Sequence, residues 1–359
     1  CLNPDGAVRY SRRNAQDIDI NRDALDLKTP EGRILDSIAR AFQPIWAFNL
    51  HDQSAYYTTD DSPRETHFSF QVPPIDKENS STEKTIDVKK LISHVISHMG
   101  SVLDNAAIGR YPDTYSENAY GERFQQYGIK TLLIESGYKK DDPEKQELRR
   151  LHAGMLVQLL DAIAYDKYEN ASSDIYDNLP ECKLNNHDLV IEHLKIPYMN
   201  AYRNSDLGFR KIFRTCQIEG ELIPVSYLGT IGKPYVLKGE KYINGKYCHF
   251  EPITVYPDTL QALSDLNELD FNSLIEKGYF AFILREPTDS CNVAADFPFI
   301  LNKLPSSEIR AGLPLSFILR GEQGENSILI HNGFVHRLNE IDTEYIRNRI
   351  KYSVNEKDD

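Results

Sequence analysis

The side chains best suited to bind and transform an anionic substrate lie in three stretches of the first half of the chain. The stretch NPDGAVRYSRRNAQDIDINRD at residues 3–23 holds four arginines in a chain of net charge −13: Arg9, Arg12, Arg13 and Arg22. Arginine presents a planar fork of donors that matches a carboxylate bidentately, and asparagine adds a donor and an acceptor. The pair Asn21–Arg22 is therefore suited to hold a carboxylate. A solvated basic loop that pairs with neighbouring acids is the alternative.

The other two stretches each place an ionisable side chain after a run of apolar residues. His51 follows residues 45–50, and Glu135 follows residues 131–134. Such runs are typical of buried strands, and open α/β sheets bind ligands at the carboxyl ends of their strands. A carboxylate is costly to bury there without a partner, and partial burial raises its pKa toward the range of a general base. We interpret Glu135 as functional, whereas a lone histidine such as His51 is more often structural.

Read in order, the three stretches resemble one known family. NPDG with R-x-N and D-I-N-R-D comes first, then Phe48-Asn49-Leu50-His51, and then Thr131–Gly137. This is the order of motifs in the zinc metallocarboxypeptidases, the carboxypeptidase A-like peptidases. The resemblance covers residues 1–165 and rests on all three motifs, because any one alone is weak. It implies a zinc-dependent hydrolase that removes C-terminal residues from peptides by attack of water, a form of proteolysis.

The resemblance assigns catalytic and metal-binding roles to three residues. His51 would be one of three protein ligands of a single zinc ion. Glu135 would take a proton from the zinc-bound water and pass it to the leaving amine. Arg12 would stabilise the tetrahedral oxyanion. Two other arginines are alternatives for that last role: Arg13 and Arg9.

The resemblance also assigns substrate-binding roles. Asn21 and Arg22 would hold the terminal carboxylate of a peptide substrate, the contact that makes such an enzyme an exopeptidase. A mobile tyrosine would donate a hydrogen bond near the scissile bond, and its spacing from Glu135 favours Tyr115. Tyr111 and Tyr120 remain open as alternatives for the tyrosine.

The expected zinc site is incomplete in this chain. In the family, the other two zinc ligands come from an H-x-x-E motif before NPDG, and no H-x-x-E occurs here. The chain also has no initiator methionine and no signal peptide, so we expect a fragment truncated before NPDG. A lipoprotein that begins at Cys1 is the alternative. The complete protein would be an active enzyme, periplasmic or extracellular as its exported bacterial relatives typically are, while this chain would bind zinc poorly.

Two other functions use the same residues. A degenerate, non-catalytic carboxypeptidase-like module would recognise peptide C-termini through Asn21 and Arg22. An amidase or deacylase that acts on peptidoglycan-type peptides would keep the scaffold and cleave another amide. The presence of Asn21–Arg22 argues against this amidase or deacylase alternative, because such relatives do not need a terminal carboxylate on their substrate.

Composition excludes other classes of protein. With 40% hydrophobic and 26% charged residues, the 359-residue chain is typical of globular proteins and has room for two domains. The net charge of −13 argues against non-specific nucleic-acid binding. No apolar run approaches the ~18 residues of a membrane span. The five cysteines form no CxxC pair, which argues against a zinc ribbon.

The pattern of apolar residues predicts an α/β fold for the first half. Pro4–Gly6 predicts a turn, and the alternation of Ile18 and Ile20 predicts a short strand. Helices are predicted over 30–42, with a buried face formed by Ile34, Leu35, Ile38, Ala39 and Phe42, and over 86–103. A last helix follows the capping residues Asp141–Glu144. Residues 52–85 are expected to form a long loop, as are 109–127.

The chain is expected to divide into two domains. Residues 1–165 would be the C-terminal portion of a carboxypeptidase-like α/β/α sandwich with a mixed sheet, lacking its N-terminal part. Residues 166–185 would be a linker, 186–354 a smaller β-rich accessory domain of short strands, and 355–359 a frayed tail. Two short helices are expected within the second domain, at 260–266 and 271–276.

Overall fold

The computed structural model divides the chain into two compact units, Cys1–Asn186 and His187–Asp359. The structure describes residues 1–9, 11–59, 65–103, 106–112, 114–139, 142, 144–215, 222–232, 237–261, 265, 268–285, 299–301, 309–313, 315–321, 327–331 and 334–340. No helix in these ranges is long and apolar enough to cross a membrane.

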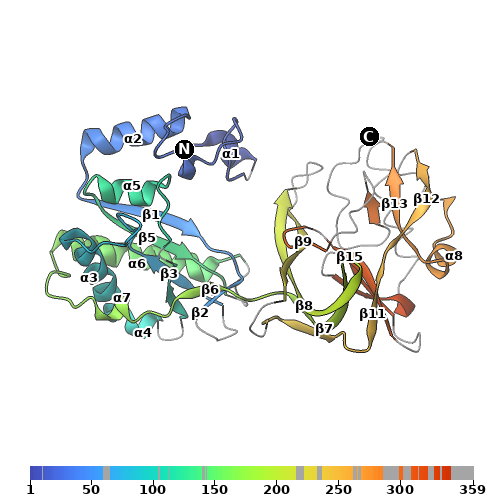
Figure 1. Ribbon diagram of the computed structural model, residues 1–359. Helices are drawn as coiled ribbons and strands as arrows, with labels where there is room; N and C mark the ends of the chain where they lie inside the picture. The colour runs from blue at the N-terminus through green and yellow to red at the C-terminus, as the bar shows by residue number, and fades with distance from the viewer. Residues whose placement is uncertain are drawn as a thin grey trace. The chain divides into compact units, whose positions relative to one another are not determined.

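The first unit is built on a mixed four-stranded sheet in the order β1-β5-β3-β4 (Figure 1). The strands are β1 (Trp46–Asp52), β5 (Lys130–Ser136), β3 (Phe68–Gln71) and β4 (Ile108–Arg110). β1 runs parallel to β5, β5 antiparallel to β3, and β3 parallel to β4. The predictions of a mixed α/β fold and of strands that carry His51 and Glu135 are confirmed.

Side chains alternate along the strands, so one face of the sheet packs into the core of the first unit and the other face points away from it. Leu132 and Ile134 of β5 join Phe68 and Phe70 of β3 in a buried cluster. The same cluster contains apolar residues of α3 (Glu83–His98) and α6 (Gln146–Ala164). Figure 1 shows α5 (Tyr120–Gln126) on the opposite side of the sheet, with α2 (Pro30–Phe42) beyond it. The odd-numbered residues of β5 face that side, because neighbouring strand residues point to opposite faces.

The N-terminal stretch is helical where we predicted a turn and a strand. Pro4–Gly6 lies in a short helix, α1 (Pro4–Val8), because the Asn3 side chain caps it by accepting from Gly6 N. The predicted strand at Ile18 and Ile20 is wrong. A 3-10 turn, η1 (Ile20–Arg22), forms there instead, because the Asp19 side chain accepts a hydrogen bond from Asn21 N.

The end of η1 is fixed by a buried carboxylate. Asp23 is 2% exposed and accepts hydrogen bonds from Lys28 N, Thr29 N and the Thr29 hydroxyl. Burial alone would raise the Asp23 pKa, but these hydrogen bonds outweigh it and hold the pKa below its ordinary value. Asp23 thereby joins the stretch that carries Arg22 to the N-terminus of α2.

Helix α2 is confirmed, but three of the five residues predicted for its buried face are exposed. Thr29 caps the helix by accepting from Gly32 N. Ile34, Ile38 and Phe42 are exposed by 50%, 49% and 79%. Ala39 is buried as predicted, and the helix turns Gly32 and Asp36 inward beside it. The reason is a contact distant in sequence, since the Tyr120 hydroxyl donates to the Gly32 carbonyl oxygen at 2.8 Å.

The expected loops contain regular structure. Residues 52–85 include β2 (Tyr57–Thr59) and the central strand β3, and 109–127 includes part of β4 and all of α5. β3 carries only four residues, two of them polar, so it lacks the long apolar run of its neighbours. The predicted helix over 86–103 is confirmed as α3 and α4 (Gly100–Leu103). Asp142 caps α6 as predicted, accepting from three backbone amides, whereas Asp141 and Pro143 lie outside the described residues.

Residues 166–185 differ from the expected linker. They contain α7 (Asp174–Asp177) and β6 (Cys182–Leu184), which pairs with β2. Tyr176 is 1% exposed within the core of the first unit, and its hydroxyl accepts a hydrogen bond from Val72 N at 3.0 Å. Burial of this large side chain ties the stretch to the first unit.

The second unit contains, among its described residues, an eight-stranded and a three-stranded sheet. The larger sheet comprises β7 (Leu189–Tyr198), β8 (Ala201–Thr215), β9 (Leu222–Ile231), β10 (Lys241–Asn244), β11 (Cys248–Pro252), β15 (Ser316–Gly321), β16 (Ile328–His331) and β17 (Phe334–Arg337). The smaller sheet comprises β12 (Thr254–Leu260), β13 (Tyr279–Leu284) and β14 (Phe299–Leu301). The predicted helix at 271–276 is confirmed as α8 (Phe271–Glu276). Most of the one at 260–266, and the tail, lie outside the described residues.

We predict that Gly137, directly after β5, cannot be replaced by alanine without loss of stability. A Cβ there would collide with the Thr66 carbonyl oxygen, which accepts from Tyr138 N. Gly137→Ala should destabilise the first unit by about 1–3 kcal/mol. Urea unfolding followed by the fluorescence of Trp46, the only tryptophan, reports on this unit.

The matched control is Gly154→Ala in α6. No heavy atom lies within 4 Å of a Cβ added at Gly154, so alanine should be neutral or stabilise the helix by roughly 0.5–1 kcal/mol. Equal stability of the two variants would contradict the close approach at Gly137.

Candidate functional site

One cavity of about 780 Å³ lies in the first unit, on the face of the sheet opposite the core. It is lined by all six residues that the sequence predicts for the site: Arg12, Asn21, Arg22, His51, Tyr115 and Glu135. These residues come from four separate parts of the sequence. The fold therefore brings together the six residues that the sequence favoured for the site.

The floor of the cavity is formed by neighbouring strands. His51 of β1 and Glu135 of β5 are directly opposite each other in the parallel register, so both side chains leave the same face of the sheet. Asn49 and Leu133 lie two residues earlier on the same strands and also line the cavity. An imidazole and a carboxylate thus stand side by side at the carboxyl ends of two parallel strands, where open α/β sheets bind ligands.

The rim of the cavity carries the basic residues of the N-terminal stretch. Arg12 Nε donates to Asp19 Oδ2 at 2.7 Å. Arg22 Nη1 donates to the Asn21 carbonyl oxygen at 2.7 Å, and Asn21 Oδ1 accepts from Tyr120 N at 3.1 Å. No carboxylate of the described residues forms an ion pair with Arg22, which leaves guanidinium donors for a ligand. The side-chain amide nitrogen of Asn21 is a further donor.

The alternative arginines are placed elsewhere. Arg13 does not line the cavity, and its guanidinium donates to the Asp17 carbonyl oxygen at 2.6 Å. Arg9 does not line it either. Of the arginines considered for the oxyanion, Arg12 alone is a lining residue.

His51 has the properties of an unprotonated ligand. Its Nε2 atom is buried and has no hydrogen-bond partner among the residues that the structure describes. Burial lowers the His51 pKa, and the positive charges of Arg12 and Arg22 lower it further. A neutral imidazole with an unpaired nitrogen fits one position of a metal site. The part of the chain that the structure describes forms no group of three His, Cys, Asp or Glu side chains for a metal, so it does not provide a complete zinc site.

Glu135 is placed to exchange a proton near neutral pH. It is 7% exposed. Burial, together with the nearby charge of Asp52, raises the Glu135 pKa to about 7, although Arg12 and Lys145 oppose the shift. A carboxyl group whose pKa lies near the working pH can both accept and return a proton.

Two of the three candidate tyrosines line the cavity. Tyr115 does so, and its hydroxyl accepts from Gln126 Nε2 at 3.0 Å. Tyr111 also lines it, with its hydroxyl 3.4 Å from that of Tyr57. Tyr120 is excluded, because its hydroxyl donates to Gly32 instead.

Sequence reasoning missed several polar lining residues, and four of them lie on regular elements: Asn49, Tyr57, Gln71 and Glu122. Strand alternation could have identified Asn49, which stands two residues before His51. The other three had no comparable signal, because their strands or helix were expected to be loops.

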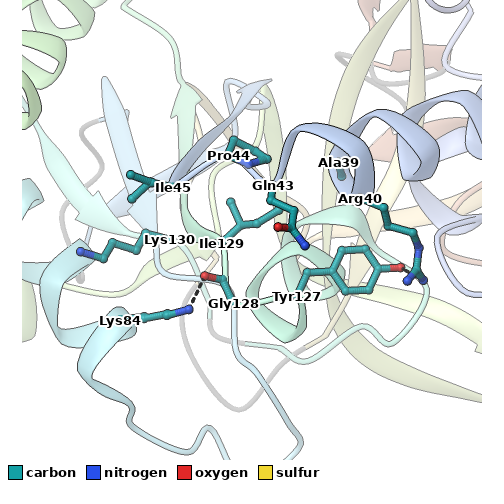
Figure 2. Close-up of a pocket in the computed structure, with 10 residues that line it drawn as sticks. All are labelled: Ala39, Arg40, Gln43, Pro44, Ile45, Lys84, Tyr127, Gly128, Ile129 and Lys130. Carbon is teal, nitrogen blue, oxygen red and sulfur yellow. Dashed lines mark hydrogen bonds between the residues drawn. The ribbon is translucent and has the colours of Figure 1, made fainter.

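A second cavity of about 590 Å³ is lined by Arg40, Lys84 and Lys130 (Figure 2). Each of these three cations already has a partner within the protein. Arg40 bonds to Asp36 and to the hydroxyl of Tyr127. Lys84 Nζ donates to the Gly128 carbonyl oxygen, and Lys130 pairs with Asp87 at 2.7 Å. Its cations are therefore less available to an anionic ligand than Arg22.

Comparison with known proteins finds no family model, curated protein or solved structure that matches the chain. The function proposed below accordingly rests on the residues and their geometry.

We predict that Glu135 makes stability depend on pH. Because its folded pKa of about 7 exceeds its ordinary value of 4.5, the folded state binds more protons than the unfolded state between these values. Stability should fall as pH rises through this window, by at most about 3 kcal/mol. Glu135→Gln should remove this loss, so the variant gains stability relative to the wild type between pH 4 and pH 8.

Urea unfolding followed by Trp46 fluorescence across that pH range measures the effect. Glu117→Gln is the control, because Glu117 is exposed and does not line the cavity. A stability difference between Glu135→Gln and wild type that stays constant with pH would contradict the buried, proton-binding state of Glu135.

Proposed function

We propose that the first unit is the substrate-binding part of a zinc-dependent carboxypeptidase, which removes C-terminal residues from peptides. The single observation that carries the proposal is the convergence of six residues, selected from separate sequence motifs, on one cavity. Their types match the needs of the reaction, which are a grip on a carboxylate, a proton carrier and a stabiliser for negative charge.

Asn21 and Arg22 would bind the terminal carboxylate of the peptide. The supporting observations are the free guanidinium donors of Arg22 and the hydrogen bond from Tyr120 N that orients the Asn21 amide. A bidentate contact with a charged group is stronger and more directional than a neutral hydrogen bond. It would set the distance between the peptide end and the pair His51–Glu135.

Glu135 would carry the proton. With its pKa at about 7 it can take a proton from water and return it to the leaving amine at neutral pH. Arg12 would stabilise negative charge on the carbonyl oxygen, and Tyr115 would donate a hydrogen bond to the substrate. A bound zinc ion would supply an activated water molecule.

His51 would be one ligand of that zinc ion. The unpaired, buried Nε2 supports this role. The two further ligands that the resemblance requires would come from residues before NPDG. We propose in addition that the first unit is part of a carboxypeptidase-like α/β/α sandwich, that the second unit is a β-rich accessory domain, and that the protein is periplasmic or extracellular.

A non-catalytic module that binds peptide C-termini is the second candidate. The observation that favours it is the single imidazole at the site, with no group of three metal-ligating side chains among the described residues. Such a module would use Asn21 and Arg22 in the same way and would need neither zinc nor proton transfer.

We predict that Arg22→Ala lowers kcat/KM for removal of a C-terminal residue about 10- to 100-fold, because hydrogen bonds to the substrate carboxylate are lost. Cleavage of the same peptide with an amidated C-terminus should change less than about twofold. Both rates are measured with the zinc site complete. Arg13→Ala, in the same basic stretch but outside the cavity, is the control. Equal losses on both peptides would favour the amidase alternative.

We also predict that this chain binds zinc weakly, with a Kd above about 1 µM, because it contributes one imidazole to the site. A longer polypeptide that includes residues before NPDG should bind zinc far more tightly and lose peptidase activity with a chelator. Zinc titration by calorimetry compares the two. Tight zinc binding by the shorter chain, abolished by His51→Gln, would contradict the expected upstream ligands.

A further inference from the structure

A small basic cavity of about 230 Å³ lies on the larger sheet of the second unit. The described residues that line it are His193 of β7, Asn204 of β8 and Lys246 of the turn between β10 and β11. None of them is acidic, although the whole chain carries a net charge of −13. The cavity therefore presents a local positive charge on a negatively charged protein.

A strained β-bulge positions His193 at this cavity. The register of β7 against β8 shifts between Ile191 and Leu194, and His193 has a φ of 57°, a left-handed conformation that is costly for a residue with a Cβ. The Asp206 side chain holds the bulge by accepting from His193 N at 2.8 Å. A glycine would adopt this conformation without strain, so the bulge itself does not require an imidazole. Bulges redirect side chains, and strain of this kind is concentrated at ligand-binding sites.

The turn that carries Lys246 is fixed beside the bulge. Gly245 N donates to the Glu192 carbonyl oxygen at 2.7 Å, which joins the turn to β7. The Lys246 ammonium lies 5.4 Å from the centre of the Tyr247 ring and forms no ion pair with a carboxylate of the described residues. Its charge and its donors are therefore available to a ligand.

The three side chains match a tetrahedral oxyanion better than a planar one. Lys246 supplies a positive charge and three donors, Asn204 supplies an amide NH₂, and His193 supplies a ring N–H. Within the part of the chain that the structure describes, the Asn204 amide has no hydrogen-bond partner. A planar carboxylate is matched best by the fork of an arginine, and no arginine is among the described lining residues. A phosphate group, with its negative charge and three terminal oxygens, fits donors that come from three separate segments.

Exposed side chains next to the cavity offer contacts to whatever carries the phosphate. Lys195 stands directly opposite Asn204 in the β7–β8 register, so both side chains leave the same face of the sheet. The Lys195 ammonium lies 5.4 Å from the centre of the Tyr202 ring, which is 65% exposed. Tyr247, next to Lys246 in the chain, is 62% exposed. Tyrosine rings present an apolar surface and a polar hydroxyl to the organic part of a ligand.

We propose that this cavity binds a terminal phosphate group, held by Lys246, His193 and Asn204. Inorganic phosphate, a sugar phosphate and the headgroup of phosphatidic acid share this chemistry. The inference uses residues of the second unit alone. It holds whether or not the first unit belongs to a carboxypeptidase.

Binding to the full chain tests the inference and distinguishes the sources of phosphate. The soluble probes are inorganic phosphate and glucose 6-phosphate, with glucuronate, a sugar that carries a carboxylate, as their control. Phosphatidylcholine vesicles with about 10% phosphatidic acid are compared with pure phosphatidylcholine vesicles by co-sedimentation. Calorimetry or ligand-detected NMR gives the dissociation constants of the soluble probes. We expect at least one phosphate probe to bind about 10-fold or more tightly than its control.

Two variants test the residues of the site with the phosphate probe that binds tightest. Lys246→Gln should weaken binding about 10-fold or more, because a charge-assisted contact is lost. His193→Gly removes the imidazole and relieves the backbone strain, so it should weaken binding about threefold or more with little change in melting temperature. Lys241→Gln, at an exposed lysine of β10 that does not line the cavity, should keep the wild-type affinity. Far-UV circular dichroism during heating reports whether each variant is folded.

Three results would overturn the proposal. The first is equal binding of every phosphate probe and its control, including no binding at all. The second is an unchanged affinity in Lys246→Gln or in His193→Gly. The third is binding that persists in Lys246→Gln and is lost in Arg22→Ala, because the phosphate would then occupy the cavity of the first unit.

Discussion

The pairing of β1 with β5, in the register that sets His51 opposite Glu135, is the constraint on which the site depends. A slip of one residue would move each side chain to the other face of the sheet. It would also turn Leu132 and Ile134 out of the core, where both are fully buried. Burial of these side chains therefore fixes the register, and the register positions the imidazole beside the carboxyl group.

Burial shifts the pKa values of the two ionisable groups at the floor of the cavity in opposite directions. It lowers the pKa of His51 and raises that of Glu135, because both are removed from water and both lose charge as a result. Arg12 lowers both pKa values from the rim. An anionic ligand at Arg12 and Arg22 would weaken that influence, so binding of such a ligand and the protonation of Glu135 would be coupled.

The sequence predicted the parts of the site that depend on local pattern. The apolar runs before His51 and Glu135 predicted strands, and the N-terminal motif selected Arg12, Asn21 and Arg22 by resemblance. It did not predict β3, whose four residues are buried on both faces although two are polar. It did not predict the exposure of Ile38 in α2 or the placement of Glu122 in the cavity, because contacts between residues far apart in sequence decide both.

The central claim is that one ligand, held by its carboxylate, reaches both the rim and the floor of the cavity. NMR of the chain with ¹⁵N-labelled arginine and histidine side chains tests it most directly, with signals assigned through Arg22→Lys and His51→Gln. A peptide with a free C-terminus should shift the signals of both the Arg22 guanidinium and the His51 imidazole, and the amidated peptide should shift neither. Equal shifts from both peptides, or no shift at either residue, would contradict the account.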